Sequence, residues 1–193
     1  MLRYAKLLFM CCVVIISACG GGNKKTEALS YYEQIYKIGA GVRIGERHLI
    51  ADLNNYADSI VASDSSYLNQ EKLNRLQDSL QAQNKRLEAA ITAIKALPEL
   101  DYPVDLRDKA IDVFEAELNF NQVNVDQALL VFDDGIVEDG ERPNIMQFQN
   151  AYAGLQSVYS EWKELRNAFC NTFGIEYDDL KQLEKKYIAE DEL

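Results

Sequence analysis

Apolar residues recur every three or four positions along four long stretches of the chain, which is the spacing that places them on one face of an α-helix. The clearest stretch covers about residues 69–97, and its apolar positions include Leu73, Leu76, Leu80, Leu87, Ile94 and Leu97. The same spacing predicts helices over about residues 26–61, 103–132 and 143–172. A shorter amphipathic stretch predicts a fifth helix over about residues 177–189.

Residues that begin or end helices separate these stretches. Pro98 ends the second predicted helix, because proline lacks a backbone N–H and clashes with the preceding turn. Pro103 suits the first turn of the third helix, and Gly174 is placed to end the fourth. Polar residues 63–66 and acidic residues 133–141 make the remaining connections. No stretch between turns alternates apolar and polar residues, so the sequence predicts an all-α fold: an elongated antiparallel four-helix bundle with a short C-terminal fifth helix.

Each of the four long apolar stripes carries one polar residue near its middle, and these are Glu46, Gln83, Asn121 and Tyr159. In an up-down bundle the helix midpoints lie at similar heights, so the four side chains would meet in one central polar layer. Such a layer would fix the register of the helices at some cost in stability. Two alternatives remain open: the stripes rotate so that the side chains never meet, or the layer forms a small polar ligand site. A buried Glu46 would need a partner, and Arg43 lies three residues earlier on the same face.

Three glycines, Gly39, Gly41 and Gly45, fall inside the first predicted helix. Each costs about 1 kcal/mol relative to alanine in a helix interior, so the group calls for an explanation. The sequence leaves three: the close approach of a neighbouring helix, a kink or break, and a cleft for a ligand or partner.

The sequence predicts no catalytic residue, cofactor site or metal site. Its one histidine, His48, has Gly45 three residues before it, whereas di-iron bundles use Glu-x-x-His pairs. No Gly-x-Ser-x-Gly elbow occurs, and residues 133–141 lack the spacing of a calcium-binding EF-hand loop. This acidic loop is predicted to be a solvated connector that serves for contact. An enzyme is therefore the least favoured class of function.

The apolar run over residues 7–19 follows a basic start and precedes three glycines. It is shorter than the roughly 20 apolar residues that span a bilayer and is typical of a secretory signal. Its last residues, Ile16-Ser17-Ala18-Cys19, resemble the lipobox of bacterial lipoprotein precursors, although Ile16 departs from the usual leucine. The resemblance implies cleavage before Cys19 and lipidation of its sulfur. An ordinary secretory signal and a short membrane anchor are the alternatives.

The resemblance divides the chain into a signal peptide over residues 1–18, a lipidated Cys19 with a flexible tether over residues 19–25, and a helical domain over residues 26–193. Two or three acyl chains anchor a protein stably, whereas one does not. In some Gram-negative lipoproteins an Asp after the lipidated cysteine causes retention at the inner membrane, but Gly20 stands there in this chain. The resemblance thus implies a location in the cell envelope, at the outer membrane rather than the inner membrane.

Charge and cysteine content narrow the partners further. The net charge of −11 would repel phosphate backbones, so no nucleic acid partner is predicted. Once the signal peptide is removed and Cys19 is lipidated, Cys170 is the single remaining thiol and cannot form an internal disulfide. It is predicted to be a buried thiol, and an intermolecular disulfide is the alternative. The overall pattern also resembles helical lipoproteins of Gram-negative bacteria. We expect a non-enzymatic, membrane-anchored lipoprotein that acts by contact with an envelope protein or as a spacer. The alternative is a module that binds a small molecule or glycan at Gly39–Gly45 or at the polar layer.

Overall fold

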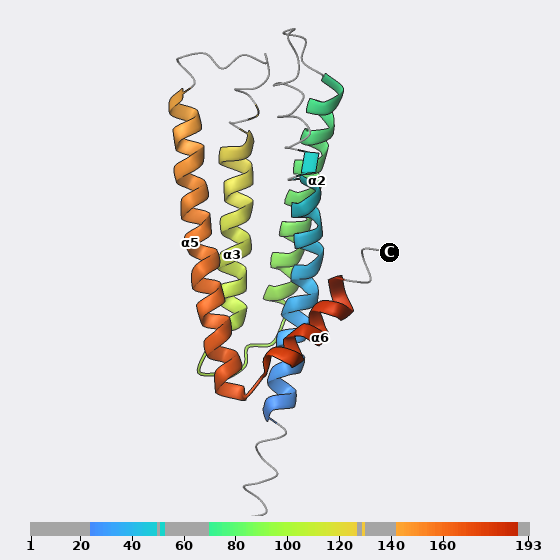
Figure 1. Ribbon diagram of the computed structural model, residues 1–193, viewed down its shortest axis with the longest axis vertical. Coiled ribbons are helices and arrows are strands. Elements are labelled where there is room, and N and C mark those ends of the chain that lie inside the picture. The colour runs from blue at the N-terminus through green and yellow to red at the C-terminus, as the bar shows by residue number, and fades with distance from the viewer. Residues whose placement is uncertain (1–23, 50, 53–69, 127–128, 130–141, 189–193) are drawn as a thin grey trace, which may run out of the picture.

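The computed structural model describes residues 24–49, 51–52, 70–126, 129 and 142–188, and this part of the chain holds helices and their connections but no strand. Its long helices lie side by side, and Figure 1 shows that neighbours along the chain run in opposite directions. They are an N-terminal helix over residues 24–49 and 51–52, α2 (Gln70–Lys95), α3 (Leu106–Phe120) and α5 (Arg142–Phe173). The short helix α6 (Tyr177–Ile188) crosses the lower half of the N-terminal helix. The predicted all-α antiparallel bundle with a short fifth helix is confirmed.

The observed helix boundaries differ in places from those predicted from the sequence, and local capping explains where α3 begins and α5 ends. Residues 24 and 25 are already helical, so the helix takes over the last two positions of the tether expected up to Lys25. Helix α3 begins at Leu106 and not near Pro103, because Asp105 is its N-cap: the Asp108 backbone N–H donates to Asp105 Oδ1 at 3.0 Å. Gly174 has φ +64 and ends α5 as predicted, since only glycine adopts this conformation without strain.

Two large apolar clusters fill the bundle at different heights, and a small third one, of Val42, Leu87 and Ala90, borders the aromatic side. The aromatic cluster lies where α6 closes the lower half, and it includes Tyr31, Tyr32, Tyr36, Ile94, Leu106, Phe169 and Leu183. The leucine cluster lies at the opposite end and includes Leu49, Leu73, Leu76, Leu80, Phe120 and Leu155. Along α2, Gln83 follows the leucine cluster and precedes Leu87, Ala90 and Ile94. The buried side chains of Gln83 and Glu117 therefore form a polar level between the two large apolar clusters.

Helix α6 is fixed to the N-terminal helix by charged contacts as well as by its buried Leu183. Lys25 Nζ lies 2.8 Å from Asp179 Oδ2, and Lys186 Nζ lies 2.7 Å from Glu33 Oε1. The Tyr187 hydroxyl donates to the same Glu33 oxygen at 2.7 Å. These contacts hold the two halves of the chain together at the base of the bundle.

Helix α3 continues directly into a π-helix, η1 (Asn121–Val125). A π-helix places more residues in each turn than an α-helix, and such segments are frequent at functional sites. This widening begins one turn after Glu117, which lies at the buried polar level.

Candidate functional site

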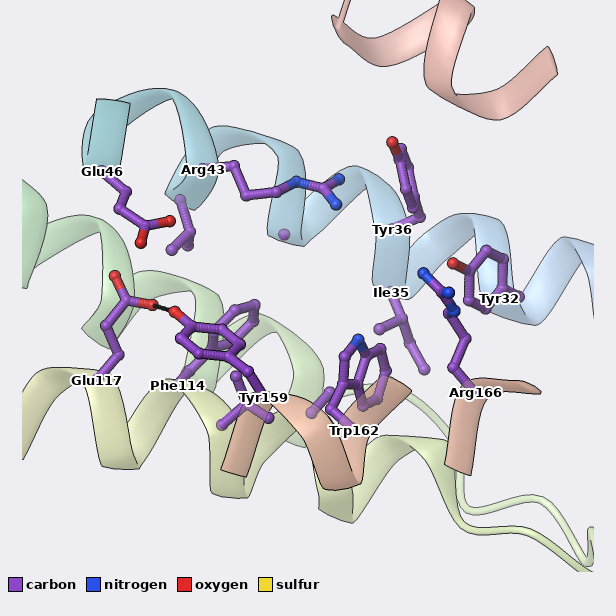
Figure 2. Close-up of a pocket in the computed structure, with 14 residues that line it drawn as sticks. Tyr32, Ile35, Tyr36, Arg43, Glu46, Phe114, Glu117, Tyr159, Trp162 and Arg166 are labelled. Carbon is purple, nitrogen blue, oxygen red and sulfur yellow. Dashed lines mark hydrogen bonds between the residues drawn. The ribbon is translucent and has the colours of Figure 1, made fainter. Parts of the chain in front are cut away.

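A pocket of about 250 Å³ opens between the N-terminal helix, α3 and α5, just beside the polar level. Figure 2 shows the side chains that line it and the directions in which they point. Five aromatic rings form much of its wall, and these are Tyr32, Tyr36, Phe114, Tyr159 and Trp162. Two arginines and two glutamates supply the charges of the lining, and these are Arg43, Arg166, Glu46 and Glu117. The pocket therefore combines a largely aromatic wall with charges of both signs.

Glycine positions explain why the space lies on this side of the N-terminal helix. Gly39 lines the pocket, and a Cβ atom added there would come within 3.4 Å of Phe114 Cζ. Gly45 lies against α2 instead, where an added Cβ would overlap the side chains of Gln83 and Arg86. Gly41 is exposed and has open space around it. The close approach of a neighbouring helix thus explains Gly45, and a cleft explains Gly39. The helix has no break at these glycines, because it is continuous from residue 24 to residue 49.

The carboxylate of Glu117 is the centre of the polar level. Glu117 is only 4% exposed. Gln83 Nε2 donates to Glu117 Oε1 at 3.0 Å, and the Tyr159 hydroxyl donates to Glu117 Oε2 at 2.7 Å. Gln83 Nε2 also donates to the Val42 carbonyl at 3.0 Å, which ties α2 and the N-terminal helix to the same carboxylate. Burial raises the pKa of Glu117 to about 6.

Glu46 lies opposite Glu117, and Figure 2 shows both carboxyl groups at the same end of the pocket. Burial is the main cause that raises the pKa of Glu46, while the nearby Arg43 and Arg47 charges lower it. The negative charge of Glu46 in turn raises the pKa of Glu117. Burial and the Glu117 charge raise the pKa of Tyr159, so its hydroxyl stays protonated and acts as a donor. This end of the pocket is therefore rich in negative charge.

The two arginines lie toward the other end. The Arg43 guanidinium lies over the Tyr36 ring, 4.3 Å from its centroid, and Figure 2 shows it extending away from Glu46. Arg43 Nε and Nη2 and Arg166 Nε are buried and meet no hydrogen-bond acceptor in the described part of the chain. Arg166 Nη2 donates to Asn167 Oδ1 at 3.3 Å, at the exposed surface. Buried donors without an acceptor are rare in folded proteins, so these call for an explanation.

The structure brings together three members of the predicted polar layer around a residue that the sequence analysis left out. Gln83 and Tyr159 both donate to Glu117, and Glu46 lies across the pocket from it. Asn121 is buried one turn further along, at the start of η1, and its Nδ2 has no acceptor within the described ranges. Among the ion pairs of the described residues there is none between Arg43 and Glu46, the partner expected for it.

A sequence signal for Glu117 was present. It lies in the series Leu106, Ala110, Val113, Glu117 and Phe120, whose steps of four and three residues mark a buried helix face. The predicted polar layer used Asn121 instead, which continues the steps of the larger neighbours Phe114 and Leu118, and both of these are only partly buried. On the buried face, the residues just before Glu117 are the smaller Ala110 and Val113, which carry a weaker apolar signal.

The remaining predicted features are placed as follows. His48 is exposed, and the part of the chain that the structure describes holds no group of three or more residues that could bind a metal ion. Cys170 is a buried free thiol, and burial raises its pKa. Cys19, the tether before residue 24 and the acidic loop over residues 133–141 lie outside the described residues.

The described helices include none that is both long and apolar enough to cross a membrane. Comparisons of this chain with protein-family models, with curated proteins and with solved structures found no match. What the protein does must therefore be inferred from the chemistry of the pocket itself.

Proposed function

We propose that this protein binds a small molecule in the pocket between the N-terminal helix, α3 and α5. The observation that carries the proposal is the set of four charged side chains held beside aromatic rings in a partly enclosed space. Small-molecule sites typically combine aromatic walls with a few convergent polar groups. Their volumes usually start near 300 Å³, so a pocket of about 250 Å³ suits a ligand of modest size.

The charges favour binding over a purely structural role. Withdrawing a carboxylate or guanidinium from water costs free energy, and a well-packed apolar core is often the more stable solution. A spacer or contact module would gain stability from leucine at positions such as 46 and 117. The sequence pattern favoured contact with an envelope protein, whereas the pocket favours the alternative of ligand binding.

Two carboxyl groups and a tyrosine also form a set that could support acid–base catalysis, but we propose binding without reaction. Each oxygen of Glu117 already accepts a hydrogen bond from the chain, from Gln83 and from Tyr159. Such bonds favour a fixed acceptor over a group that exchanges protons with a substrate. The raised pKa of Tyr159 keeps this hydroxyl from serving as a base near neutral pH.

Anchoring through a lipid on Cys19 is part of the same proposal and is supported by the lipobox resemblance of residues 16–19. It would hold the binding domain at a membrane of the cell envelope, with the outer membrane preferred over the inner one. The variant Cys19→Ala should be released from membranes on fractionation, and a variant that still sediments with membranes would contradict the anchor.

Native mass spectrometry of the protein released gently from its own envelope tests the binding proposal. Gly39→Leu would fill the pocket wall, whereas Gly41→Leu makes the same change two residues away at an exposed position. Both replace a helix-interior glycine and should raise helix propensity alike. We expect an added mass of a few hundred daltons on the wild type and on Gly41→Leu, and its loss in Gly39→Leu. A bare wild-type protein, or a ligand retained equally by both variants, would contradict the proposal.

A further inference from the structure

We infer that the pocket binds a short zwitterionic molecule, with its carboxylate group at the Arg43–Arg166 end and its ammonium group at the Glu46–Glu117 end. A di- or tripeptide with free termini is the simplest ligand of this kind. The inference deepens the proposed function and rests on it, because it assigns a chemical class to the ligand of the same pocket.

The charges of opposite sign are separated along the pocket. In Figure 2 the carboxyl groups of Glu46 and Glu117 lie at one end, and Arg166 lies at the other beside Tyr32. Tyr159, which donates to Glu117, and Arg166 are both on α5 and are two helical turns apart. At 1.5 Å per residue this separation is roughly 10 Å along the bundle. A single small ion would therefore balance the charge at only one end of the pocket.

The arginine end suits a carboxylate. Arg43 and Arg166 line the same pocket: the Arg43 guanidinium lies over the Tyr36 ring, and Figure 2 shows Arg166 beside Tyr32. Arg43 forms no ion pair with a carboxylate of the described chain, and the same is true of Arg166. Guanidinium groups present paired donors that match the two oxygens of a carboxylate. A ligand carboxylate would supply acceptors to donors that the fold leaves without them.

The glutamate end suits an ammonium group. None of the hydrogen bonds among the described residues involves the Glu46 carboxylate, although burial withdraws it from water. Glu117 is held in place by Gln83 and Tyr159 and adds a second negative charge beside Glu46. An ammonium group carries three donors and a positive charge, so it would relieve the repulsion between the two carboxylates.

The distance between the ends sets the length of the ligand. An extended chain spans about 3.3–3.6 Å per residue, so a separation of roughly 10 Å corresponds to two or three residues. The middle of the pocket is lined by Ile35, Phe114 and Trp162, which would contact the body of the ligand. With a volume of about 250 Å³, the pocket favours small side chains. Trialanine is therefore a suitable probe.

Isothermal titration calorimetry on the full-length protein tests this inference with three probes: trialanine, its N-acetyl derivative and its C-terminal amide. We expect trialanine to bind and each cap to weaken binding at least about tenfold, because each removes one of the two charges. The orientation is tested by two variants. Arg166→Gln should remove the penalty for the amide and keep the penalty for acetylation, and Glu46→Gln should do the reverse.

Matched controls come from neighbouring exposed positions on α5. Lys163→Gln and Glu164→Gln make the same charge changes outside the pocket and should leave all three affinities unchanged. Equal affinity for free and capped peptides, or cap penalties that neither pocket variant alters, would overturn the inference. If no peptide binds but native mass spectrometry shows a bound molecule that Gly39→Leu removes, the inference of a zwitterionic ligand fails and the proposed function stands. If neither is observed, both proposals fail.

Discussion

The N-terminal helix carries a glycine at each of two borders, one with α2 and one with α3 and α5, and the two borders are built in opposite ways. Toward α2, the absence of a side chain at Gly45 lets Gln83 and Arg86 approach the helix backbone directly. Toward α3 and α5, the absence of one at Gly39 becomes part of an open pocket. The same residue type thus allows close packing on one side and space on the other. What decides the outcome is the side chain that the neighbouring helix presents.

The two glutamates of the polar level differ in the same manner. Glu117 is almost fully buried, but both of its oxygens accept hydrogen bonds from the chain. Glu46 is less buried and faces the pocket without such bonds in the described part of the structure. A buried polar group with all partners in place strengthens a fold, whereas one without partners is available to a ligand. This difference separates the structural side of the polar level from its binding side.

The largest change in stability is expected from adding a side chain at Gly45, where the N-terminal helix packs closely against α2. In Gly45→Ala the new Cβ would overlap Gln83, which is fully buried and held by hydrogen bonds to Glu117 and Val42. Overpacking and the loss of these bonds should lower the free energy of unfolding by about 3 kcal/mol, despite a gain in helix propensity. Urea denaturation would measure the change.

Gly41→Ala is the matched control, because open space surrounds that position. It should raise the free energy of unfolding by up to about 1 kcal/mol through helix propensity alone. Equal stability of the two variants would mean that the close contact at Gly45 does not constrain the fold, and the contrast between the two borders would be lost.

The sequence predicted the helices well because each long stripe buries large residues at regular steps, as Leu73, Leu76 and Leu80 show in α2. Gln83 could also be placed, since it continues that regular series. Glu117 was missed because it follows small residues, Ala110 and Val113, on its helix face.

The pocket itself was not predictable from the periodicity. Its volume depends on how three helices approach one another, and nothing in the local sequence distinguishes Gly39, which faces space, from Gly45, which faces Gln83. The start of α3 depended likewise on a single capping hydrogen bond from Asp108 to Asp105 rather than on the proline nearby. Spacing determines which face is buried, but contacts between helices determine how completely it is filled.

A smaller effect is expected from pH. Burial raises the pKa of Glu117 to about 6, from 4.5 for an exposed glutamate, so the folded state binds this proton more tightly than the unfolded state. Stability from this group is therefore greatest at low pH and is lost as pH rises through about 6. The full difference is about 2 kcal/mol, and we expect about 1 kcal/mol of added stability between pH 7 and pH 5. The raised pKa of Glu46 acts in the same direction.

Urea denaturation of the wild type at both pH values, compared with Glu117→Gln, would measure this effect. Glu33 and Asp179 have lowered pKa values and therefore titrate mainly below this window. Glu115→Gln, at an exposed position on the same helix, should keep the full pH response. A pH response that survives in Glu117→Gln would show that another group carries it.

The smallest effect is expected from Glu46→Gln, which keeps the size of the side chain and removes its charge. Loss of a partly buried carboxylate beside a second one should raise the free energy of unfolding at pH 7 by about 0.5 kcal/mol. The pKa of Glu117 should also fall toward its ordinary value. Carbon-13 NMR of the glutamate carboxyl groups across pH would follow that titration, with Glu164→Gln as an exposed control that leaves it unchanged. An unchanged Glu117 midpoint would mean that the two carboxylates act independently, and the pocket would then hold two separate acids instead of the paired negative end that an ammonium group needs.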